Sequence, residues 1–300
     1  MTDIRGRVAF ITGGGGSIGG AIARALAAEG ATVAVADILP DHAQEVVDGI
    51  AAAGGTAVPV ICDQSDRASL RKAKAEANEA LGAVTLLFAI AGASSWQRLD
   101  ETTDDDVDYM YGVNQMGVVD SLRVFLPDMV EAGGGHVVGT ASVAGLAPAQ
   151  LPYHSLYGSS KLAVIGLMMG IGYELAEVGV GSTVLIPSGV VTKMAQNLQR
   201  YRPERFGGPT EGKIEAPETV KQIFAEQQRT WRPAEEVAEM VLLAVRENHP
   251  IVVTDGLDRA VFQETYVQAL MEAFDRVDAY EQALGDRAGK ARSFDEMSAG

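Results

Sequence analysis

Tyr157 and Lys161 are spaced so that both side chains can act on one proton. Residues 157–161 (YGSSK) are expected to begin a helix, in which side chains four apart lie on the same face. Free tyrosine has a pKa near 10, so lowering that pKa by about three units requires roughly 4 kcal/mol. The Lys161 ammonium and the positive ring of an oxidised nicotinamide can supply this energy in a water-poor cleft. The pair predicts a phenolate that removes an alcohol proton as hydride leaves the carbinol carbon, or returns it in the reverse direction.

Ser142 and Asn114 are the other two candidates for this chemistry. Ser142 directly follows a predicted strand at residues 136–141, where its hydroxyl can hold the substrate oxygen. Asn114 lies in a predicted helical zone at residues 104–131 and can anchor a water molecule next to Lys161 in a proton relay. A tyrosine four residues before a lysine occurs by chance in many helices. The Tyr157–Lys161 pair therefore supports this chemistry only together with Ser142, Asn114 and the other motifs of the sequence.

A glycine-rich turn near the N-terminus predicts a dinucleotide site. Residues 12–19 (TGGGGSIG) join a predicted strand to a predicted helix, and glycines there let the backbone approach a pyrophosphate at the helix N-terminus. The alternative for such a segment, taken alone, is a tight turn without a ligand. The expected cofactor contacts within it are Gly13, Ser17, Ile18 and Gly19.

Asp37 indicates which dinucleotide binds. It ends the second predicted strand, roughly 20 residues after the glycine turn, where a carboxylate accepts hydrogen bonds from the adenosine ribose and repels a 2′-phosphate. No Lys or Arg at residues 14–17, 38 or 39 offsets that charge. NAD(H) is therefore expected in preference to NADP(H), against the alternative of a surface aspartate that caps a strand. Asp63, after the third predicted strand, is a candidate acceptor for the adenine amino group.

Strands and helices alternate along most of the chain, and the strands are short apolar runs. Strands are predicted at residues 7–12, 32–36, 57–62, 84–91, 136–141, 181–186 and 251–254, and helices at 17–30, 41–53, 66–81, 104–131, 155–178, 216–230, 233–248 and 258–284. Apolar strands separated by helices are typical of a parallel sheet covered on both faces. Right-handed crossovers make this a doubly wound sheet of about seven strands, in an α/β single-domain Rossmann fold over residues 1–300.

Taken in order, these residues resemble the short-chain dehydrogenase/reductase family, over about residues 1–190 and more loosely to 255. The shared features are T-G-x-x-x-x-I-G at residues 12–19, Asn114, S-V-A-G from Ser142, Tyr157-x-x-x-Lys161 and Pro187-x-x-x-x-Thr192. The resemblance implies that Asn114, Ser142, Tyr157 and Lys161 are the catalytic residues. It also implies cofactor contacts at Ala89, Tyr157, Lys161, Val190 and Thr192, with Ala89 and Val190 acting through the backbone. Members are usually homodimers or homotetramers with paired long helices.

Four features depart from the family pattern. Ser17 stands where the second loop glycine is usual, and Ala89-Ile90 replaces a pair of asparagines. Ser188 replaces a glycine after Pro187. The spacing from Ser142 to Tyr157 is longer than the commonest one, which predicts an enlarged loop at residues 146–156. All four departures concern the sheet framework or the cofactor site, and none removes a residue that is expected to transfer a proton.

Residues 191–232 form a long irregular insertion after the sixth predicted strand, beside the edge of the sheet at which ligands bind. We expect a substrate lid there, followed by a helical extension at about residues 258–285. The candidate walls of a roomy, partly apolar pocket are Trp96, Leu146, Leu151, Tyr153, Met194, Tyr201, Phe206 and Trp231, with ordinary packing as the alternative for each. The expected substrate is a bulky hydrophobic or aromatic secondary alcohol or the matching ketone.

Two other functions remain open. A dinucleotide-binding regulator that has lost its chemistry is compatible with the fold, but it predicts a missing tyrosine or lysine, and both are present. An NAD(H)-dependent reductase of an activated oxoacyl thioester is the second alternative. Such a reductase needs a basic patch on which a phosphorylated carrier docks, and this acidic sequence shows none.

The composition argues against several further classes. Forty acidic and 24 basic side chains give a formal net charge of −16, which repels nucleic acid and anionic lipid. No apolar run reaches the roughly 20 residues that span a bilayer, and no signal peptide is expected before residue 7. The single cysteine, Cys62, and four scattered histidines offer neither a disulfide framework nor a metal site, so the cytoplasm is expected. Of these histidines, His136 is expected to be structural and His154 to face solvent.

Overall fold

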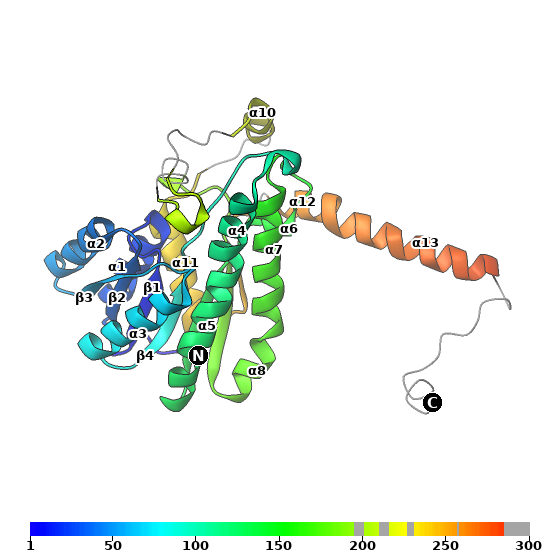
Figure 1. The fold of residues 1–300 in the computed structure, drawn as a ribbon. Helices are drawn as coiled ribbons and strands as arrows, with labels where there is room; N and C mark the ends of the chain where they lie inside the picture. The colour runs from blue at the N-terminus through cyan, green and yellow to red at the C-terminus, as the bar shows by residue number, and fades with distance from the viewer. Residues whose placement is uncertain (195–200, 210–215, 227–230, 257, 285–300) are drawn as a thin grey trace, which may run out of the picture.

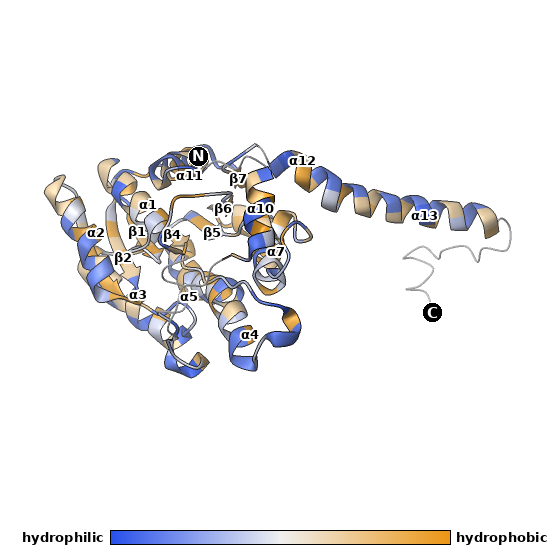
Figure 2. Ribbon diagram, turned by 90° about the horizontal axis from the view of Figure 1, so that it is seen from above, coloured by the Kyte–Doolittle hydropathy of each residue, from blue (hydrophilic) through white to orange (hydrophobic). Residues whose placement is uncertain are grey.

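Seven parallel strands form one sheet in the computed structural model, which describes residues 1–194, 201–209, 216–226, 231–256 and 258–284. The strands are β1 (Val8–Thr12), β2 (Thr32–Asp37), β3 (Thr56–Ile61), β4 (Val84–Ala89), β5 (Gly135–Thr140), β6 (Val180–Ile186) and β7 (Ile251–Val253). Their order across the sheet is β3-β2-β1-β4-β5-β6-β7 (Figures 1 and 2). The predicted doubly wound parallel sheet is confirmed.

The chain starts in the middle of this sheet, and that start creates a crevice. β1 pairs with β2 on one side and with β4 on the other. The chain winds outward from β1 to β3, crosses to β4, and then winds outward to β7. The segments that follow β1 and β4 therefore separate at the carboxyl ends of these strands, the usual place of a ligand site in such a sheet.

Helices cover both faces of the sheet (Figure 1), and each face has its own apolar core. One face carries α1 (Ser17–Ala28), α2 (Pro40–Ala52) and α11 (Ala234–Glu247), which bury Ile22, Val46 and Val241. The other carries α3 (Arg67–Leu81), α5 (Gly117–Glu131) and α7 (Ser155–Gly170), which bury Leu70, Phe125 and Val164. Because both faces are covered, the strands contain apolar residues on both sides, which explains their continuous apolar runs.

The helical zone predicted at residues 104–131 contains one irregular turn. It consists of α4 (Asp104–Tyr111), the π-helical turn η2 (Gly112–Met116) and α5. Asn114 lies in η2, and single π turns inside helices are frequent at functional sites. The helix predicted at 155–178 is also divided, into α7 and α8 (Gly172–Glu177).

Two segments that lie outside the sheet and its covering helices follow β6 in the chain. The predicted lid contains η3 (Glu204–Phe206) and α10 (Glu218–Glu226), whereas its residues 195–200, 210–215 and 227–230 lie outside the described residues. The predicted C-terminal extension consists of α12 (Asp258–Phe262), the π-helical turn η4 (Gln263–Val267) and α13 (Gln268–Leu284). We call residues 258–284 the arm, because they project away from the sheet (Figures 1 and 2). Within the described ranges, no helix combines the length and the apolar character that crossing a membrane requires.

His136 is fully buried in β5 and supports the frame, as expected. Its Nδ1 lies 3.3 Å from Thr2 Oγ1 and its Nε2 lies 2.8 Å from Thr183 Oγ1. Burial, and to a lesser extent the N-terminal charge, lowers the pKa of His136 to about 4. An unfolded histidine has a pKa near 6.5, so unfolding binds a proton between these two values.

We therefore expect His136 to make the protein less stable as the pH falls from about 6.5 to 4. On the order of 2 kcal/mol of the free energy of unfolding is lost in this window. Urea unfolding at several pH values measures this dependence. The free energy of unfolding should fall less steeply with falling pH for His136→Gln than for the wild type. His249→Gln is the control, because His249 is on the surface. Equal slopes for all three proteins would contradict the assignment.

Candidate active site

The glycine turn after β1 forms a cradle at the N-terminus of α1. Gly13 has a φ of +62°, and a Cβ there would lie 2.8 Å from the Cα of Ala91. A Cβ on Gly19 would lie 2.2 Å from the carbonyl oxygen of Gly13. No side chain caps the start of α1, so its first N–H groups are left for an anion. The turn fits the pyrophosphate of a dinucleotide.

Ser17 and Ile18 line the same cleft as this turn. The hydroxyl of Ser17, at the position where a glycine is usual, accepts a hydrogen bond from Lys193 N at 3.4 Å. Lys193 belongs to the segment that follows β6. The departure at Ser17 therefore ties the glycine turn to the start of the predicted lid.

Asp37 lies at the end of β2 with its carboxylate directed at the glycine turn. Its two oxygens accept hydrogen bonds from Gly15 N and Leu39 N, each at 3.0 Å. Burial raises the pKa of this carboxyl group, and the two backbone donors oppose the rise. Arg24 of α1 also lines the cleft, which the sequence reasoning did not consider. Its guanidinium lies 4.0 Å from Glu235, so a carboxylate already balances part of its charge.

Asp63 lines the cleft too, but in this structure it holds Arg205 of the segment predicted to be a lid. Its Oδ2 pairs with Arg205 Nη2 at 2.7 Å, and its Oδ1 accepts hydrogen bonds from the backbone and side chain of Ser65. The predicted contact with adenine must therefore share this carboxylate with Arg205. We call residues 201–209 the strap, since they run along the cleft.

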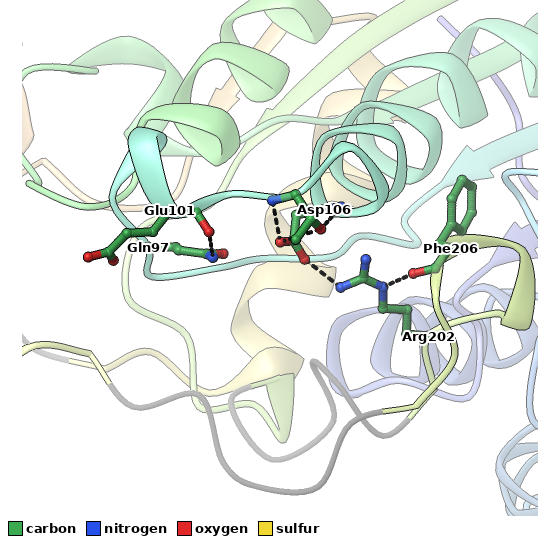
Figure 3. A network of polar contacts seen from close by, with 6 residues as sticks. Gln97, Glu101, Asp106, Arg202 and Phe206 are labelled. Atoms are coloured by element: carbon green, nitrogen blue, oxygen red, sulfur yellow. Dashed lines mark hydrogen bonds and ion pairs between the residues drawn. The ribbon is translucent and has the colours of Figure 1, made fainter.

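A second ion pair fixes the strap to α4 (Figure 3). Arg202 is buried, and its Nη1 pairs with Asp106 Oδ1 at 2.5 Å. Its Nε donates a hydrogen bond to the carbonyl oxygen of Phe206, and its guanidinium lies 5.3 Å from the ring centre of Tyr109. Asp106 also accepts a hydrogen bond from the backbone N–H of Thr103 and is thereby held at the start of α4. Both arginines of the strap are thus paired with aspartates outside it, Arg202 with Asp106 and Arg205 with Asp63.

Replacing Arg202 by methionine should loosen the strap and weaken cofactor binding. Removing one partner leaves the Asp106 charge without its cation, which is costly for a group that is largely buried. We expect the dissociation constant for NADH, measured by titration calorimetry, to rise about tenfold, equivalent to roughly 1.4 kcal/mol. Arg98→Met removes an exposed ion pair with Asp100 and should leave the constant unchanged. Equal affinity in both variants would show that the strap does not hold the cofactor.

Tyr157, Lys161 and Ser142 meet where β5 and α7 border the cleft. Tyr157 and Lys161 are buried in α7, and Lys161 Nζ donates a hydrogen bond to the carbonyl oxygen of Thr140 at 2.9 Å. The same Nζ lies 5.8 Å from the ring centre of Tyr157. The predicted approach of the tyrosine and the lysine within one helix is therefore present.

Burial dominates the electrostatics of this pair. It raises the pKa of Tyr157, and a hydrogen bond with the Ser142 side chain opposes the rise. Burial also lowers the pKa of Lys161 to about 7. For the protein groups by themselves the pKa of Tyr157 is raised, because burial favours the neutral phenol and, at Lys161, the neutral amine. A further positive charge in the cleft is needed to favour the phenolate.

Asn114 is fully buried behind the lysine. Its Oδ1 accepts a hydrogen bond from Ala93 N at 2.8 Å, and its Nδ2 donates to the Ala93 carbonyl at 2.9 Å and to Ser160 Oγ at 3.0 Å. A Cβ placed on Gly92 would lie 3.3 Å from Asn114 Oδ1 and 3.4 Å from Lys161 Nζ. Asn114 and Lys161 therefore flank one glycine, and the Asn114 side chain serves to hold the segment after β4.

Gln64 links the ends of β1 and β4 to the π turn η2. Ala89 ends β4, and the lining of the cleft begins at the next residue, Ile90. The amide of Gln64 accepts a hydrogen bond from Thr12 Oγ1 and donates to the carbonyls of Ala91 at 3.2 Å and Val113 at 2.9 Å. Gln64 was not among the predicted site residues, since its only signal in the sequence is a polar residue shortly after a predicted strand.

His154 is buried, contrary to the expectation that it faces solvent. Its Nδ1 lies 2.6 Å from the Ser95 carbonyl oxygen, and its ring stacks on Trp96 with centres 3.8 Å apart. The ring centre of Tyr157 lies 4.4 Å from that of His154. Burial lowers the pKa of His154 to about 4, although the bond to Ser95 opposes this, so the imidazole is neutral at pH 7. The enlarged loop provides the backbone that brings His154 under Trp96.

Helix α10, in the predicted lid, joins this stack through Phe224. The Phe224 ring meets Trp96 edge-on at 6.5 Å and Trp231 edge-on at 6.2 Å. We call the five rings of Trp231, Phe224, Trp96, His154 and Tyr157 the ring stack. Tyr153 does not belong to it: its φ is +62°, its side chain is exposed, and its carbonyl accepts a hydrogen bond from Gln97 N.

The cleft that collects these residues has a volume of about 820 Å³. Of the residues predicted to contact a cofactor, Gly13, Ser17, Ile18, Gly19, Asp37, Asp63, Tyr157, Lys161, Val190 and Thr192 all line it. Of the predicted pocket walls, Met194, Tyr201 and Trp231 line it as well. Leu146 packs against the core instead, and Phe206 packs against Tyr109 at 5.5 Å. The strap side chain Tyr201 meets His42 edge-on at 5.6 Å.

A glycine turn at the N-terminus of α1 and a tyrosine–lysine pair share one cleft at the carboxyl ends of a doubly wound sheet. This combination defines a dinucleotide-dependent oxidoreductase. The model of a family described as short chain dehydrogenase matches residues 7–203. The chain belongs to the short-chain dehydrogenase family, whose cofactor is a nicotinamide dinucleotide.

Three known proteins illustrate this relationship. The C alpha-dehydrogenase of Sphingobium sp. SYK-6 is 32% identical over 250 residues, which cover 83% of this chain and 80% of that protein. The 2,5-dichloro-2,5-cyclohexadiene-1,4-diol dehydrogenase LinX of Sphingobium indicum is 32% identical over 65% of this chain and 77% of its own. A short chain dehydrogenase/reductase from Burkholderia phymatum, solved in complex with NAD, superposes with a TM-score of 0.82 at 31% identity, over 91% of this chain and 97% of that one.

Proposed function

We propose that this protein oxidises a secondary alcohol to a ketone with NAD, or performs the reverse reduction, and that Tyr157 is the proton-transfer residue. The main support is the geometry of one cleft. It places the Tyr157 side chain on the Ser142 hydroxyl, beside Lys161, at the same crevice as the glycine turn and Asp37. The two related dehydrogenases agree with this reaction class.

The residues around the cleft fit the cofactor in three places. The N-terminus of α1 receives the pyrophosphate, Asp37 receives the ribose hydroxyls, and Val190 and Thr192 border the nicotinamide end. Because Asp37 already accepts two backbone hydrogen bonds and carries a negative charge, a 2′-phosphate is disfavoured there. NAD(H) is the proposed cofactor in preference to NADP(H). Bound NAD⁺ supplies the hydride acceptor and a positive ring.

Each catalytic residue has a separate task in this proposal. Ser142 holds the substrate oxygen, and Tyr157 as phenolate takes its proton while the C–H bond of the carbinol breaks and its electron pair leaves as hydride. Lys161 supports the phenolate, and Asn114 fixes the backbone beside Lys161. In the reverse direction Tyr157 gives its proton to the ketone oxygen. One proton and one hydride move in each direction, so oxidation would yield a ketone and reduced cofactor, and reduction would yield an alcohol and oxidised cofactor.

The proposed substrate is a bulky hydrophobic or aromatic alcohol. The cleft is large, and Met194, Tyr201 and Trp231 of the lid region add apolar surface to it. We also propose that residues 191–232 act as a substrate lid on a single domain of residues 1–300. The buried free thiol of Cys62 suits a reducing compartment such as the cytoplasm. A homodimer or homotetramer is the proposed assembly.

Absorbance at 340 nm tests the proposal directly, using NAD and NADP with a panel of secondary alcohols. The panel should contain aryl, alkyl and polar sugar alcohols of graded size. NAD-dependent turnover of the bulky apolar members is the expected result. Turnover of small sugars alone would refute the substrate class. Tight NADH binding without any turnover would favour a regulator, and reduction of an oxoacyl thioester alone would favour the thioester reductase.

A further inference from the structure

The strap makes its contacts at one end of the cleft, on the side of β2 and β3. The ring of Tyr201 meets that of His42 in α2 edge-on, with centres 5.6 Å apart. Arg205 pairs with Asp63, which follows β3. In the sheet, β2 and β3 lie on one side of β1, whereas β5 and β6 lie on the other. The chain that leaves β6 therefore crosses the cleft before it forms the strap.

This end of the cleft is where the proposed cofactor places its adenosine. In a doubly wound sheet, the acidic residue at the end of the second strand binds the adenosine ribose, and the pyrophosphate lies on the first helix. Asp37 holds the first of these positions, and the N-terminus of α1 holds the second. Ile38 and His42, shortly after Asp37, line the cleft. Tyr201 and Pro203 of the strap line the same cleft, so the strap borders the adenosine end.

We propose that the strap clamps the adenosine of the bound dinucleotide, an inference that rests on the proposed NAD(H)-dependent function. The ring of Tyr201 supplies an aromatic surface on which a purine stacks, and Pro203 adds an apolar contact beside it. Tyr201, expected from the sequence to be a wall of the substrate pocket, is thereby assigned to the cofactor.

The insertion at residues 191–232 then acts at both ends of the cofactor. Phe224 of α10 and Trp231 belong to the ring stack, which ends at Tyr157. That part of the insertion borders the place where the proton and the hydride move, whereas the strap borders the adenosine. Substitutions in the two parts should therefore have separable effects on substrate binding and on cofactor binding.

Two ion pairs of unequal burial hold the strap (Figure 3). The side chain of Arg202, which pairs with Asp106, is 6% exposed, and that of Arg205, which pairs with Asp63, is 41% exposed. A buried ion pair is costly to break by removing one partner, whereas an exposed pair contributes little to stability. Arg202 therefore keeps the strap on α4, while Arg205 gives way when adenine competes for Asp63. Because Arg202 already orders the strap, little ordering cost remains when the cofactor binds.

The binding of two parts of the cofactor to the full chain tests the clamp. ADP-ribose contains the adenosine and the pyrophosphate, whereas reduced nicotinamide mononucleotide contains the nicotinamide without the adenosine. We expect Tyr201→Ala to raise the dissociation constants of ADP-ribose and NADH about tenfold, because one stacking ring is lost. The constant for the mononucleotide should stay within about twofold of the wild type. Titration calorimetry measures all three constants.

Trp231→Ala, in the other part of the insertion, is the matched control. It should raise KM for the best alcohol of the panel and leave the dissociation constant of ADP-ribose unchanged. Tyr173→Ala removes an exposed tyrosine of α8 and should change neither quantity. Circular dichroism of each variant shows whether the sheet remains folded.

The outcomes separate the clamp from the proposed function. Equal ADP-ribose affinity in Tyr201→Ala and the wild type overturns the clamp, and so does an equal loss in Trp231→Ala. In either case NAD-dependent turnover of the alcohols would still support the proposed function. A wild-type protein that binds neither ADP-ribose nor NADH overturns both.

Photolabelling locates the adenine in the unaltered protein. The probe is NAD with an azido group on its adenine ring, and irradiation is followed by trypsin digestion and mass spectrometry. Trypsin does not cleave between Arg202 and Pro203, so the strap yields the peptide 201–205 (YRPER). We expect the label in this peptide, and an excess of ADP-ribose should suppress it. Labelling confined to peptides outside the strap overturns the clamp.

Discussion

Replacing Tyr157 by phenylalanine should reduce kcat at least about 1,000-fold, while the protein still folds and binds NADH. The substitution removes only the hydroxyl oxygen, which exchanges the proton in the proposed reaction, and a positioned acid–base group contributes roughly 10²–10⁴-fold. The ring stays in its buried place against His154. Single-turnover reduction of NAD, followed at 340 nm with the best alcohol of the panel, measures the loss.

Tyr111→Phe is the matched control for this substitution. Tyr111 also carries a hydroxyl that bonds to α7, at 2.8 Å from Ser159 Oγ, but on the outer side of the helix. Its loss should leave kcat within about twofold of the wild type, as for most surface changes. A Tyr157→Phe enzyme with normal kcat would remove Tyr157 from the mechanism. Equal losses in the two variants would indicate damage to α7 rather than to the proton transfer.

Changing Asp37 to alanine and Ile38 to arginine should reverse the cofactor preference. The ratio of kcat/KM with NAD to that with NADP should fall by about 1,000-fold. Losing hydrogen bonds from the ribose to a charged acceptor costs roughly 1.5–3 kcal/mol, and a new arginine–phosphate pair adds a similar term in favour of NADP. Ile38 is suited to this change because it is partly exposed and lines the cleft.

Asp37→Asn separates the two contributions. The amide keeps an oxygen that can accept from Gly15 N or Leu39 N, but it has no charge to repel a phosphate. We expect this variant to gain activity with NADP while it keeps most of its activity with NAD. Steady-state kinetics with both cofactors measure the ratio. An unchanged ratio in both variants would show that residues other than Asp37 select the cofactor.

The strands could be predicted from the sequence because of the way they are buried. Residues of β1 such as Phe10 and Ile11 are covered on both faces, which leaves a continuous apolar run between glycine-rich breaks. The π turn η2 gives no such signal, because a single extra residue per turn hardly disturbs the helical pattern of apolar residues. The division between α7 and α8 also escaped prediction, because it consists of Ile171 alone, whose backbone stays in the right-handed helical region.

The site was predictable where its residues are close in the sequence. The glycine turn, and Tyr157 with Lys161, are local motifs whose geometry follows from one turn or one helix. Contacts between distant segments were missed. Arg202 and Asp106 are 96 residues apart, and no local pattern pairs them. His154 was expected in solvent because its stacking partner Trp96 lies on a different loop.

The ring stack has a consequence for how unfolding of this protein is read. The sequence contains two tryptophans, and both belong to the stack, where each contacts Phe224 of α10 in the proposed lid. Intrinsic fluorescence therefore reports the contact between lid and body, whereas far-ultraviolet circular dichroism reports the sheet. Because local opening needs less free energy than global unfolding, the fluorescence transition will come first in a denaturant titration. The fluorescence and circular dichroism transitions will therefore have different midpoints. That difference measures how firmly the proposed lid is held, and it does not indicate a folding intermediate of the sheet.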